Sequence, residues 1–312
     1  MSRFQVLTLD GGGIRGLFSA AILAAAEEDL GIRIADHFDL IAGTSTGGII
    51  ALGLGLGMRP RDLVDFYVQC GPRIFSDPLR FRGLLRLIVR KYSSCPLERA
   101  LRAVFEDRRF GESEKRLVIA SYNLGEDDVY LFRTPHAERL RRDFKVPAWQ
   151  VALATAAAPT YFPVCRAVDD LRLVDGGVWA NNPAMVAVTE TFGTLHVPLE
   201  HTWLLSIGTY DPVERRPASL NKGGVAFWAK SATGIILRAG SIGVNNQVRY
   251  LLGPDHVLRV DPKVPPADVV LDRTKGTSGL IARARHYSRV FMPAIHEKFV
   301  QHKAVLYTPL YS

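Results

Sequence analysis

The chain has 312 residues, of which 47% are hydrophobic, and its 39 Lys and Arg against 31 Asp and Glu give a net charge of +8. This composition excludes a disordered or fibrous protein and supplies enough apolar side chains for a large core in one or two domains. The basic balance favours an anionic partner, which could be a membrane surface, a nucleotide or a nucleic acid.

The sequence predicts neither a membrane span nor a disulfide framework. The most apolar stretch, residues 47–58, is too short to cross a bilayer, and the N-terminal residues lack the apolar core of a signal peptide. The three cysteines, Cys70, Cys95 and Cys165, are widely spaced and form no metal-binding pattern. We therefore expect a cytoplasmic protein without a bound metal, whose contact with membranes is peripheral.

Strand patterns and helix patterns alternate along the chain, which predicts an α/β fold with a mainly parallel sheet. The predicted strands are residues 4–9, 38–42, 116–121, 129–133, 171–174 and 202–207. The predicted helices are residues 17–30, closed by Gly31, a run from about residue 46, residues 148–157 and a segment after Pro183. The turn-rich residues 211–225 divide the single predicted domain, residues 1–312, into a catalytic core (4–210) and a C-terminal extension (211–312).

Two glycine-rich turns each connect a predicted strand to a predicted helix. Residues 43–47 have the pattern G-x-S-x-G, which holds the hydroxyl of Ser45 away from the backbone in a sharp turn. Residues 10–16 (DGGGIRG) contain three consecutive glycines, whose backbone N–H groups can point together at an anion near a helix N-terminus. A nucleophile and an anion-binding loop together indicate acyl transfer.

A third strand pattern runs into Asp175, which is followed by two further glycines, Gly176 and Gly177. Sites on parallel sheets assemble at the carboxyl ends of the strands, so Asp175 can meet Ser45 there and act as its base. An exposed Asp, with a pKa near ~3.9, is a poor base for a hydroxyl. The role therefore implies that Asp175 is partly buried, since burial raises the pKa of a carboxyl group.

The residues leave other functions open. A Ser-Asp-His triad in the chain order of α/β-hydrolases would need a downstream histidine. The candidates are His196, His201, His256 and His286. The glycine run also matches a dinucleotide-binding fingerprint in part, with Asp36 and Asp39 loosely placed as its acidic residue, and a non-catalytic module could use it to bind an anion. Ser45 and Asp175 are unnecessary for anion binding, which favours the enzyme.

Three stretches, taken in order, resemble the signature of patatin-like phospholipases: residues 10–16, 43–47 and 175–177. Residues 149–163 and 177–183 fit the same family, so the resemblance spans roughly residues 4–210. It implies a three-layer α/β/α patatin-like fold with a mainly parallel central sheet. It also implies a lipid acyl hydrolase that uses a Ser-Asp dyad without histidine, metal or other cofactor.

Carried over by position, the resemblance implies that Ser45 is the nucleophile and Asp175 the base. An esterase-type H-G-G-G motif would have His where this chain has Asp10, which favours the dyad over the triad. The expected reaction is phospholipase A-type release of fatty acids from membrane phospholipids. The sn-1 or sn-2 selectivity and the preferred head group stay open.

The resemblance also implies roles for the turn residues. The oxyanion hole would consist of backbone N–H groups of Gly11, Gly12 and Gly13. Arg15 would brace this loop or add positive charge near it. The supporting glycines would be Gly43, Gly47 and Gly176.

Residues 73–91 carry six basic residues and one acid. On a helix, Arg82, Arg86 and Arg90 would form a basic stripe beside an apolar face made of Phe81, Leu84, Leu85 and Ile88. This pattern predicts either an interfacial helix that docks on anionic lipid and leads it to the site, or an ordinary surface helix. The first interpretation places the enzyme peripherally at the inner membrane.

Residues 3–67 resemble in particular bacterial patatin-like effectors of antiphage (CBASS-type) signalling, which a cyclic oligonucleotide activates. This implies antiviral defence and a cyclic dinucleotide activator held by basic residues away from the dyad. The candidates are Arg215, Arg216, Lys222, Lys230, Arg238 and Arg249, whose scatter also fits a solvated surface. We expect no nucleic acid polymer as a partner, and homo-oligomer formation stays open.

Overall fold

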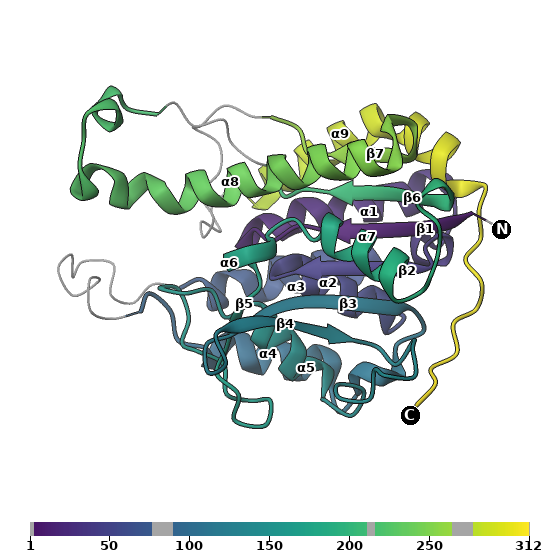
Figure 1. The fold of residues 1–312 in the computed structure, drawn as a ribbon, viewed down its shortest axis with the longest axis horizontal. Coiled ribbons are helices and arrows are strands. Elements are labelled where there is room, and N and C mark those ends of the chain that lie inside the picture. Colours follow the sequence, from purple (N-terminus) through teal and green to yellow (C-terminus); the bar gives the residue numbers. More distant parts are fainter. Residues whose placement is uncertain (1–2, 77–89, 211–215, 264–276, 312) are drawn as a thin grey trace.

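The computed structural model describes residues 3–76, 90–210, 216–263 and 277–311. These residues form a seven-stranded sheet with helices on both faces (Figure 1). The strand order is β4-β3-β2-β1-β6-β7, and β5 pairs with β3 outside this path. The strands are β1 (Phe4–Leu9), β2 (Leu40–Thr44), β3 (Arg116–Asn123), β4 (Asp128–Arg133), β5 (Leu173–Asp175), β6 (Thr202–Ile207) and β7 (Val257–Val260).

The sheet is mixed but mainly parallel. β1 pairs in parallel with β2 and β6, as do β2 with β3 and β6 with β7, whereas β4 and β5 run antiparallel to β3. The predicted α/β fold with a mainly parallel sheet is confirmed, and all six predicted strands are present with ends shifted by two residues or fewer. β7, at one edge, was not predicted.

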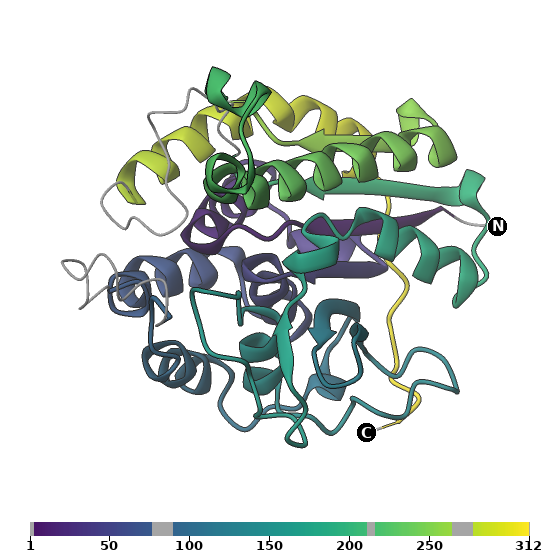
Figure 2. The same cartoon turned by 60° about the vertical axis from the view of Figure 1, so that its left-hand side comes forward.

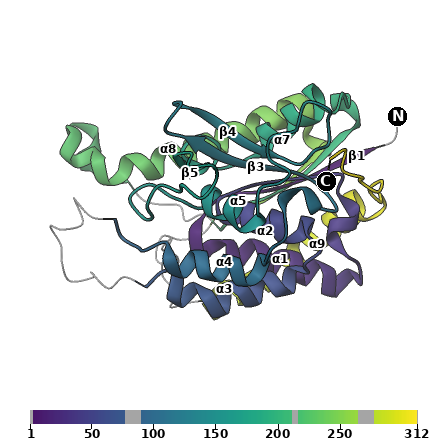
Figure 3. The ribbon, with the colours of Figure 1, turned by 90° about the horizontal axis from the view of Figure 1, so that it is seen from below.

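Helices cover the two faces of the sheet (Figures 2 and 3). The larger layer contains α1 (Gly16–Leu30), α2 (Thr46–Gly55), α3 (Pro60–Ile74), α4 (Cys95–Phe105), α5 (Ala148–Thr155) and α9 (Thr277–Ile295). The smaller layer contains α6 (Gly177–Ala180), α7 (Ala184–Gly193) and α8 (Val225–Leu252). As predicted, α1 ends at Gly31, whose φ of 63° lies in the left-handed region.

The strands at the centre are apolar on both faces because both faces are covered by helices. In β1, Leu7 and Leu9 belong to the core under the larger layer, and Val6 belongs to the core under the smaller layer. Helix α1 is apolar nearly all round because it packs against α3 and α9 as well as the sheet.

Residues beyond the predicted boundary complete the same sheet and core. β7 extends the sheet through its pairing with β6, and α9 packs against α1. Of the turn-rich boundary segment, residues 211–215 lie outside the described part of the chain, and the remainder contains a 3-10 turn (Ala218–Asn221) before α8. The 28-residue α8 was not predicted.

Phe299 fastens the C-terminal segment to the core. It is 0% exposed in a π-helical turn (His296–Val300), its ring lies 5.9 Å from that of Phe38, and its carbonyl accepts a hydrogen bond from Gln5 Nε2. We expect Phe299→Ala to lower the free energy of unfolding by about 3–5 kcal/mol, because it deletes a fully buried aromatic side chain. Leu306→Ala, at an 86% exposed position nearby, should change it by less than about 0.5 kcal/mol. Equal stability of the two variants in denaturant titrations would contradict this role.

Candidate active site

Two strands of opposite direction share one edge of β3. β2 pairs with the first part of this edge and ends with Thr44 opposite Ala120. β5 pairs with the second part and ends with Asp175 opposite Ser121, the next residue of β3. The two strands therefore end beside one another, and the register brings Asp175 next to the turn that follows Thr44. We expected Asp175 at the end of a parallel strand, and this direction was wrong.

Ser45 occupies the sharp turn between β2 and α2. Its φ of 55° and ψ of −125° form a conformation that non-glycine residues rarely adopt, and such strain costs about 1–3 kcal/mol. Its N–H donates to Thr155 Oγ1 at 2.9 Å, and Thr155 Oγ1 donates to the carbonyl of Ala120 at 2.6 Å. These contacts from α5 and β3 hold the turn, which directs the Ser45 side chain away from the strand.

The three supporting glycines lie where backbones pack too closely for a side chain. A Cβ atom on Gly43 would lie 2.3 Å from the carbonyl oxygen of Gly47, and one on Gly47 would lie 2.1 Å from that of Leu9. A Cβ atom on Gly176 would lie 2.4 Å from the carbonyl oxygen of Ala120. Their absence of a side chain lets β1, β2, β3 and α2 meet around Ser45.

Asp175 is 5% exposed and accepts a hydrogen bond from the Ser45 side chain. Burial raises the pKa of this carboxyl group to about 6, although the hydrogen bonds from Ser45 and from the Gly177 N–H (2.7 Å to Oδ1) lower it in part. A carboxylate with this pKa is ionised at neutral pH, yet is basic enough to take a proton from a hydroxyl in a transition state.

The glycine loop after β1 lies against Ser45. A Cβ atom on Gly11 would lie 3.3 Å from Ser45 Cβ, and the Gly11 N–H donates to the carbonyl of Asn181 at 2.9 Å. Within the described part of the chain, the N–H groups of Gly12 and Gly13 make no hydrogen bond. Of the three N–H groups expected to form an oxyanion hole, that of Gly11 thus already donates to Asn181.

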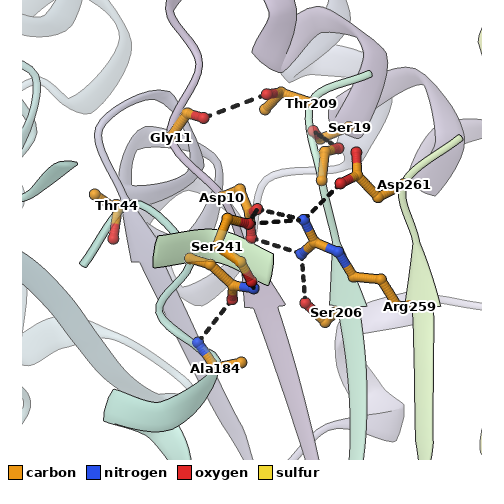
Figure 4. Close-up of polar contacts among 12 residues, drawn as sticks. Asp10, Gly11, Ser19, Thr44, Ala184, Ser206, Thr209, Ser241, Arg259 and Asp261 are labelled. Atoms are coloured by element: carbon orange, nitrogen blue, oxygen red, sulfur yellow. Dashed lines mark hydrogen bonds and ion pairs between the residues drawn. The ribbon is translucent and has the colours of Figure 1, made fainter. Parts of the chain in front are cut away.

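The loop is held from two sides. Arg15, 8% exposed, points Nε at the carbonyl of Gly12 at 3.4 Å, which fits the bracing role expected for it. Thr209, just after β6, donates to the carbonyl of Gly11 at 3.3 Å (Figure 4). A Cβ atom on Gly12 would lie 2.3 Å from Thr209 Oγ1, so the loop and Thr209 approach each other only because residue 12 is glycine.

Asp10, at the start of the loop, forms a buried ion pair with Arg259 of β7 (Figure 4). Arg259 donates to both carboxylate oxygens, at 2.8 and 2.6 Å, and also to Asp261 Oδ2 and Ser206 Oγ. Burial alone would lower the pKa of Arg259, but the charges of Asp10 and Asp261 raise it above its ordinary value. We did not predict Arg259. The available signal was a lone charge within the apolar run at residues 257–260, since a buried charge needs a partner.

Helix α8 joins the same network. Ser241 Oγ lies 3.4 Å from Asp10 Oδ2, and the Ser241 carbonyl accepts a bond from Asn182 Nδ2 at 3.3 Å. Asn182 Oδ1 in turn accepts the N–H of Ala184 at the start of α7 (Figure 4). The glycine loop, α7 and α8 are thus linked through one set of polar contacts.

Within the described residues, none of the four histidines of the triad alternative hydrogen-bonds to Ser45 or Asp175. His201 and His256 come just before β6 and β7, at the amino ends of these strands, whereas Ser45 follows the carboxyl end of β2. His256 stacks there on Trp203, with ring centroids 4.3 Å apart. His286 lies on α9 beside Tyr287, and His196 follows α7.

One hydroxyl–imidazole–carboxylate chain does exist, but it is closed to substrate. Thr134 Oγ1 lies 2.9 Å from His136 Nδ1, and His136 Nε2 lies 2.9 Å from Glu190 Oε1. Thr134 is 0% exposed and its hydroxyl oxygen accepts the N–H of Leu117 at 2.8 Å. This arrangement ties β4 to α7 and offers no nucleophile.

Several basic residues that were expected to bind an activator or anionic lipid lie outside the described residues. Arg215, the side chain of Lys230, and Arg82 and Arg86 of the expected interfacial helix lie outside the described residues. Lys222 precedes α8 and Arg249 is in its last turn, and both are exposed. At 1.5 Å per residue, these two lie roughly 35 Å apart along the helix, so they do not belong to one pocket.

The ion pair of Asp10 generates a stability prediction. We expect Arg259→Met to lower the free energy of unfolding by about 3–5 kcal/mol, because it removes the guanidinium that binds both carboxylate oxygens of the buried Asp10. The control is Arg249→Met, at an exposed position in the last turn of α8. It should change the free energy of unfolding by less than about 0.5 kcal/mol. Adding Asp10→Asn to Arg259→Met should recover part of the loss in chemical denaturation. A double variant no more stable than the single one would contradict the pairing.

Comparison with known proteins agrees with this geometry. A family model described as "Patatin-like phospholipase" matches residues 7–188. The chain is 34% identical to a protein named "cGAMP-activated phospholipase" from Pseudomonas aeruginosa, over 96% of this chain and 93% of that protein. A protein of the same name from Vibrio cholerae is 30% identical over 97% of this chain and 94% of its own length.

Among solved structures, VipD from Legionella pneumophila aligns with a TM-score of 0.52, covering 95% of this chain and 67% of VipD. Their sequences are 13% identical, so this likeness concerns the fold alone. The resemblance drawn from the three glycine-rich motifs is confirmed by the family match. The chain belongs to the patatin-like phospholipase family of lipid acyl hydrolases.

Proposed function

We propose that this protein releases fatty acids from membrane phospholipids with a Ser45–Asp175 dyad, and that a cyclic dinucleotide activates it in antiviral defence. The observation that carries the dyad is the hydrogen bond from Ser45 to a buried carboxylate whose pKa is raised to about 6. This bond lies beside the glycine loop, whose Gly12 and Gly13 N–H groups make no hydrogen bond within the described residues.

In the first step, Asp175 takes the proton of Ser45 while Oγ attacks the ester carbonyl carbon. The negative charge that develops on the carbonyl oxygen is stabilised by the N–H groups of Gly12 and Gly13, each worth ~2.7–4 kcal/mol by analogy with other oxyanion donors. The ester C–O bond then breaks, and Asp175 gives its proton to the leaving alcohol. In the second step, Asp175 takes a proton from water as the water oxygen attacks the acyl carbonyl carbon. The bond from this carbon to Ser45 Oγ then breaks, Asp175 gives its proton to Oγ, and the fatty acid is released.

The surroundings of the dyad suit a lipid substrate. α6 begins two residues after Asp175 and exposes Val178 and Trp179, at 43% and 38%. Trp is favoured at the boundary between lipid and water. None of the helices formed by the described residues is long and apolar enough to span a membrane. We infer a peripheral contact, made from the cytoplasm with the inner membrane.

The activator is inferred from the relatives. The proteins named cGAMP-activated phospholipases match this chain over nearly its full length, including the part beyond residue 210. That part contacts the glycine loop through Arg259 and Ser241, so a ligand that shifts β7 or α8 would also shift the loop. This gives the proposed activator a structural route to the dyad.

The proposal is tested by fatty-acid release from mixed phospholipid vesicles, with and without a panel of cyclic dinucleotides. We expect release by the wild type in the presence of one of them. Ser45→Ala and Asp175→Asn should each lower the rate by about a thousandfold or more, because the nucleophile and base act as a unit.

Exposed residues supply matched controls for the same chemical changes. Ser278→Ala and Asp128→Asn should keep wild-type rates. Strong release by folded Ser45→Ala would rule out the dyad. Equal release with and without every nucleotide would rule out the activation, and leave a constitutive phospholipase.

The pKa of Asp175 gives a pH dependence. A general base acts only when ionised, so kcat/KM should rise about tenfold per pH unit below about 6 and level off above it. The measurement is p-nitrophenyl ester hydrolysis between about pH 5 and pH 8, with circular dichroism at each pH as the folding control. Replacing each of the four downstream histidines by glutamine should leave the profile unchanged. A profile that stays flat through pH 6 would contradict the role of Asp175.

A further inference from the structure

A cavity of about 270 Å³ lies between α4, α5 and residues 162–167. Its floor is made of side chains that are less than a tenth exposed: Leu97, Leu153, Ala157, Phe162 and Cys165. Its volume equals that of roughly nine water molecules in the liquid, which is at the small end for a ligand site.

The walls of this cavity are joined to the backbone of the dyad. The carbonyl of Ala157 accepts the N–H of Asp175 at 3.0 Å. Cys165 and Leu173 exchange two backbone hydrogen bonds, at 2.8 and 2.9 Å, so the cavity lies directly beyond β5. On α5, Leu153 lines the cavity two residues before Thr155, whose hydroxyl holds the Ser45 N–H.

The cavity also lies on the face of the sheet toward which the Asp175 side chain points. Side chains alternate along a strand, so Leu173 and Asp175 of β5 point to the same face. Leu173 belongs to the core that includes Leu153 and Phe162 of the cavity. The base and the cavity are therefore on the same side of β5.

The charged residues of the cavity are at its rim and are paired. Glu98 accepts a bond from Arg102 at 3.0 Å, and Arg166 donates to Asp170 at 3.1 Å. An apolar interior with its charges paired at the rim suits an alkyl chain and not an anion.

We propose that this cavity is the acyl-chain subsite, which binds the first part of the fatty acyl chain whose carbonyl Ser45 attacks. The inference rests on the proposed hydrolase function. It adds to that function the part of the substrate that the enzyme recognises, which is the acyl chain. Each methylene buried there favours the longer ester by roughly fourfold, until the cavity is full.

The test compares kcat/KM for p-nitrophenyl octanoate and butyrate, with and without cGAMP. The wild type should prefer the octanoate. Two variants fill the cavity: Ala167→Phe, at a half-buried lining position, and Val164→Trp, at a rim position that is 38% exposed and outside the hydrophobic core. Each should lower the preference for octanoate by about tenfold or more. Butyrate hydrolysis should fall much less than octanoate hydrolysis, because the shorter chain fills less of the cavity. Ala103→Phe, at an exposed position of α4 outside the lining, is the matched control.

Unchanged octanoate preference in both filled variants would overturn the subsite while leaving the hydrolase intact. If the wild type hydrolyses neither ester, the proposed function fails and the cavity is tested by calorimetry with sodium octanoate. Binding to the wild type that Ala167→Phe weakens about tenfold would then support an alkyl site. Absence of binding would overturn it.

Discussion

The candidate site depends on the edge of β3, which pairs with β2 along one part and with β5 along the next. Because the two strands run in opposite directions, they end together. This places the sharp turn at Ser45, with a φ of 55°, beside the carboxylate of Asp175, which is 5% exposed. The strain at Ser45 and the burial of Asp175 follow from one arrangement of three strands.

That burial has an energetic consequence for the whole protein. The pKa of Asp175 is raised from 3.8 to about 6, so between these values the folded state binds a proton that the unfolded state has lost. The stabilisation from this proton is complete below the unfolded pKa and is lost as the pH rises through about 6. At neutral pH the ionised Asp175 thus lowers stability, and the large core under α1 and α5 must offset it. As the proposed base, Asp175 would act in the pH range where it stabilises the fold least.

Local signals made the turns and most strands predictable from sequence. Glycines at positions 43 and 47 are required where a side chain would meet backbone, and a sheet covered on both faces produces continuous apolar runs. The direction of β5 was not predictable, because its three residues carry no sign of which strand they pair with. Arg259 was missed because its partner, Asp10, lies far away in the sequence. The two residues come together only through the strand order β1-β6-β7. α8 was missed because Gly234, Gly240 and Gly243 interrupt its pattern.

The pairing of Asp10 with Arg259 also bears on synthesis of the chain. At roughly 5–20 residues per second, a ribosome needs on the order of ten seconds or more to reach β7 after it has made β1. Throughout that time Asp10, at the start of the glycine loop, lacks the two hydrogen bonds that Arg259 donates to it. A nascent or prematurely terminated chain therefore holds Ser45 and Asp175 without a settled loop beside them. The proposed phospholipase would in this way become competent only after β7 has been made.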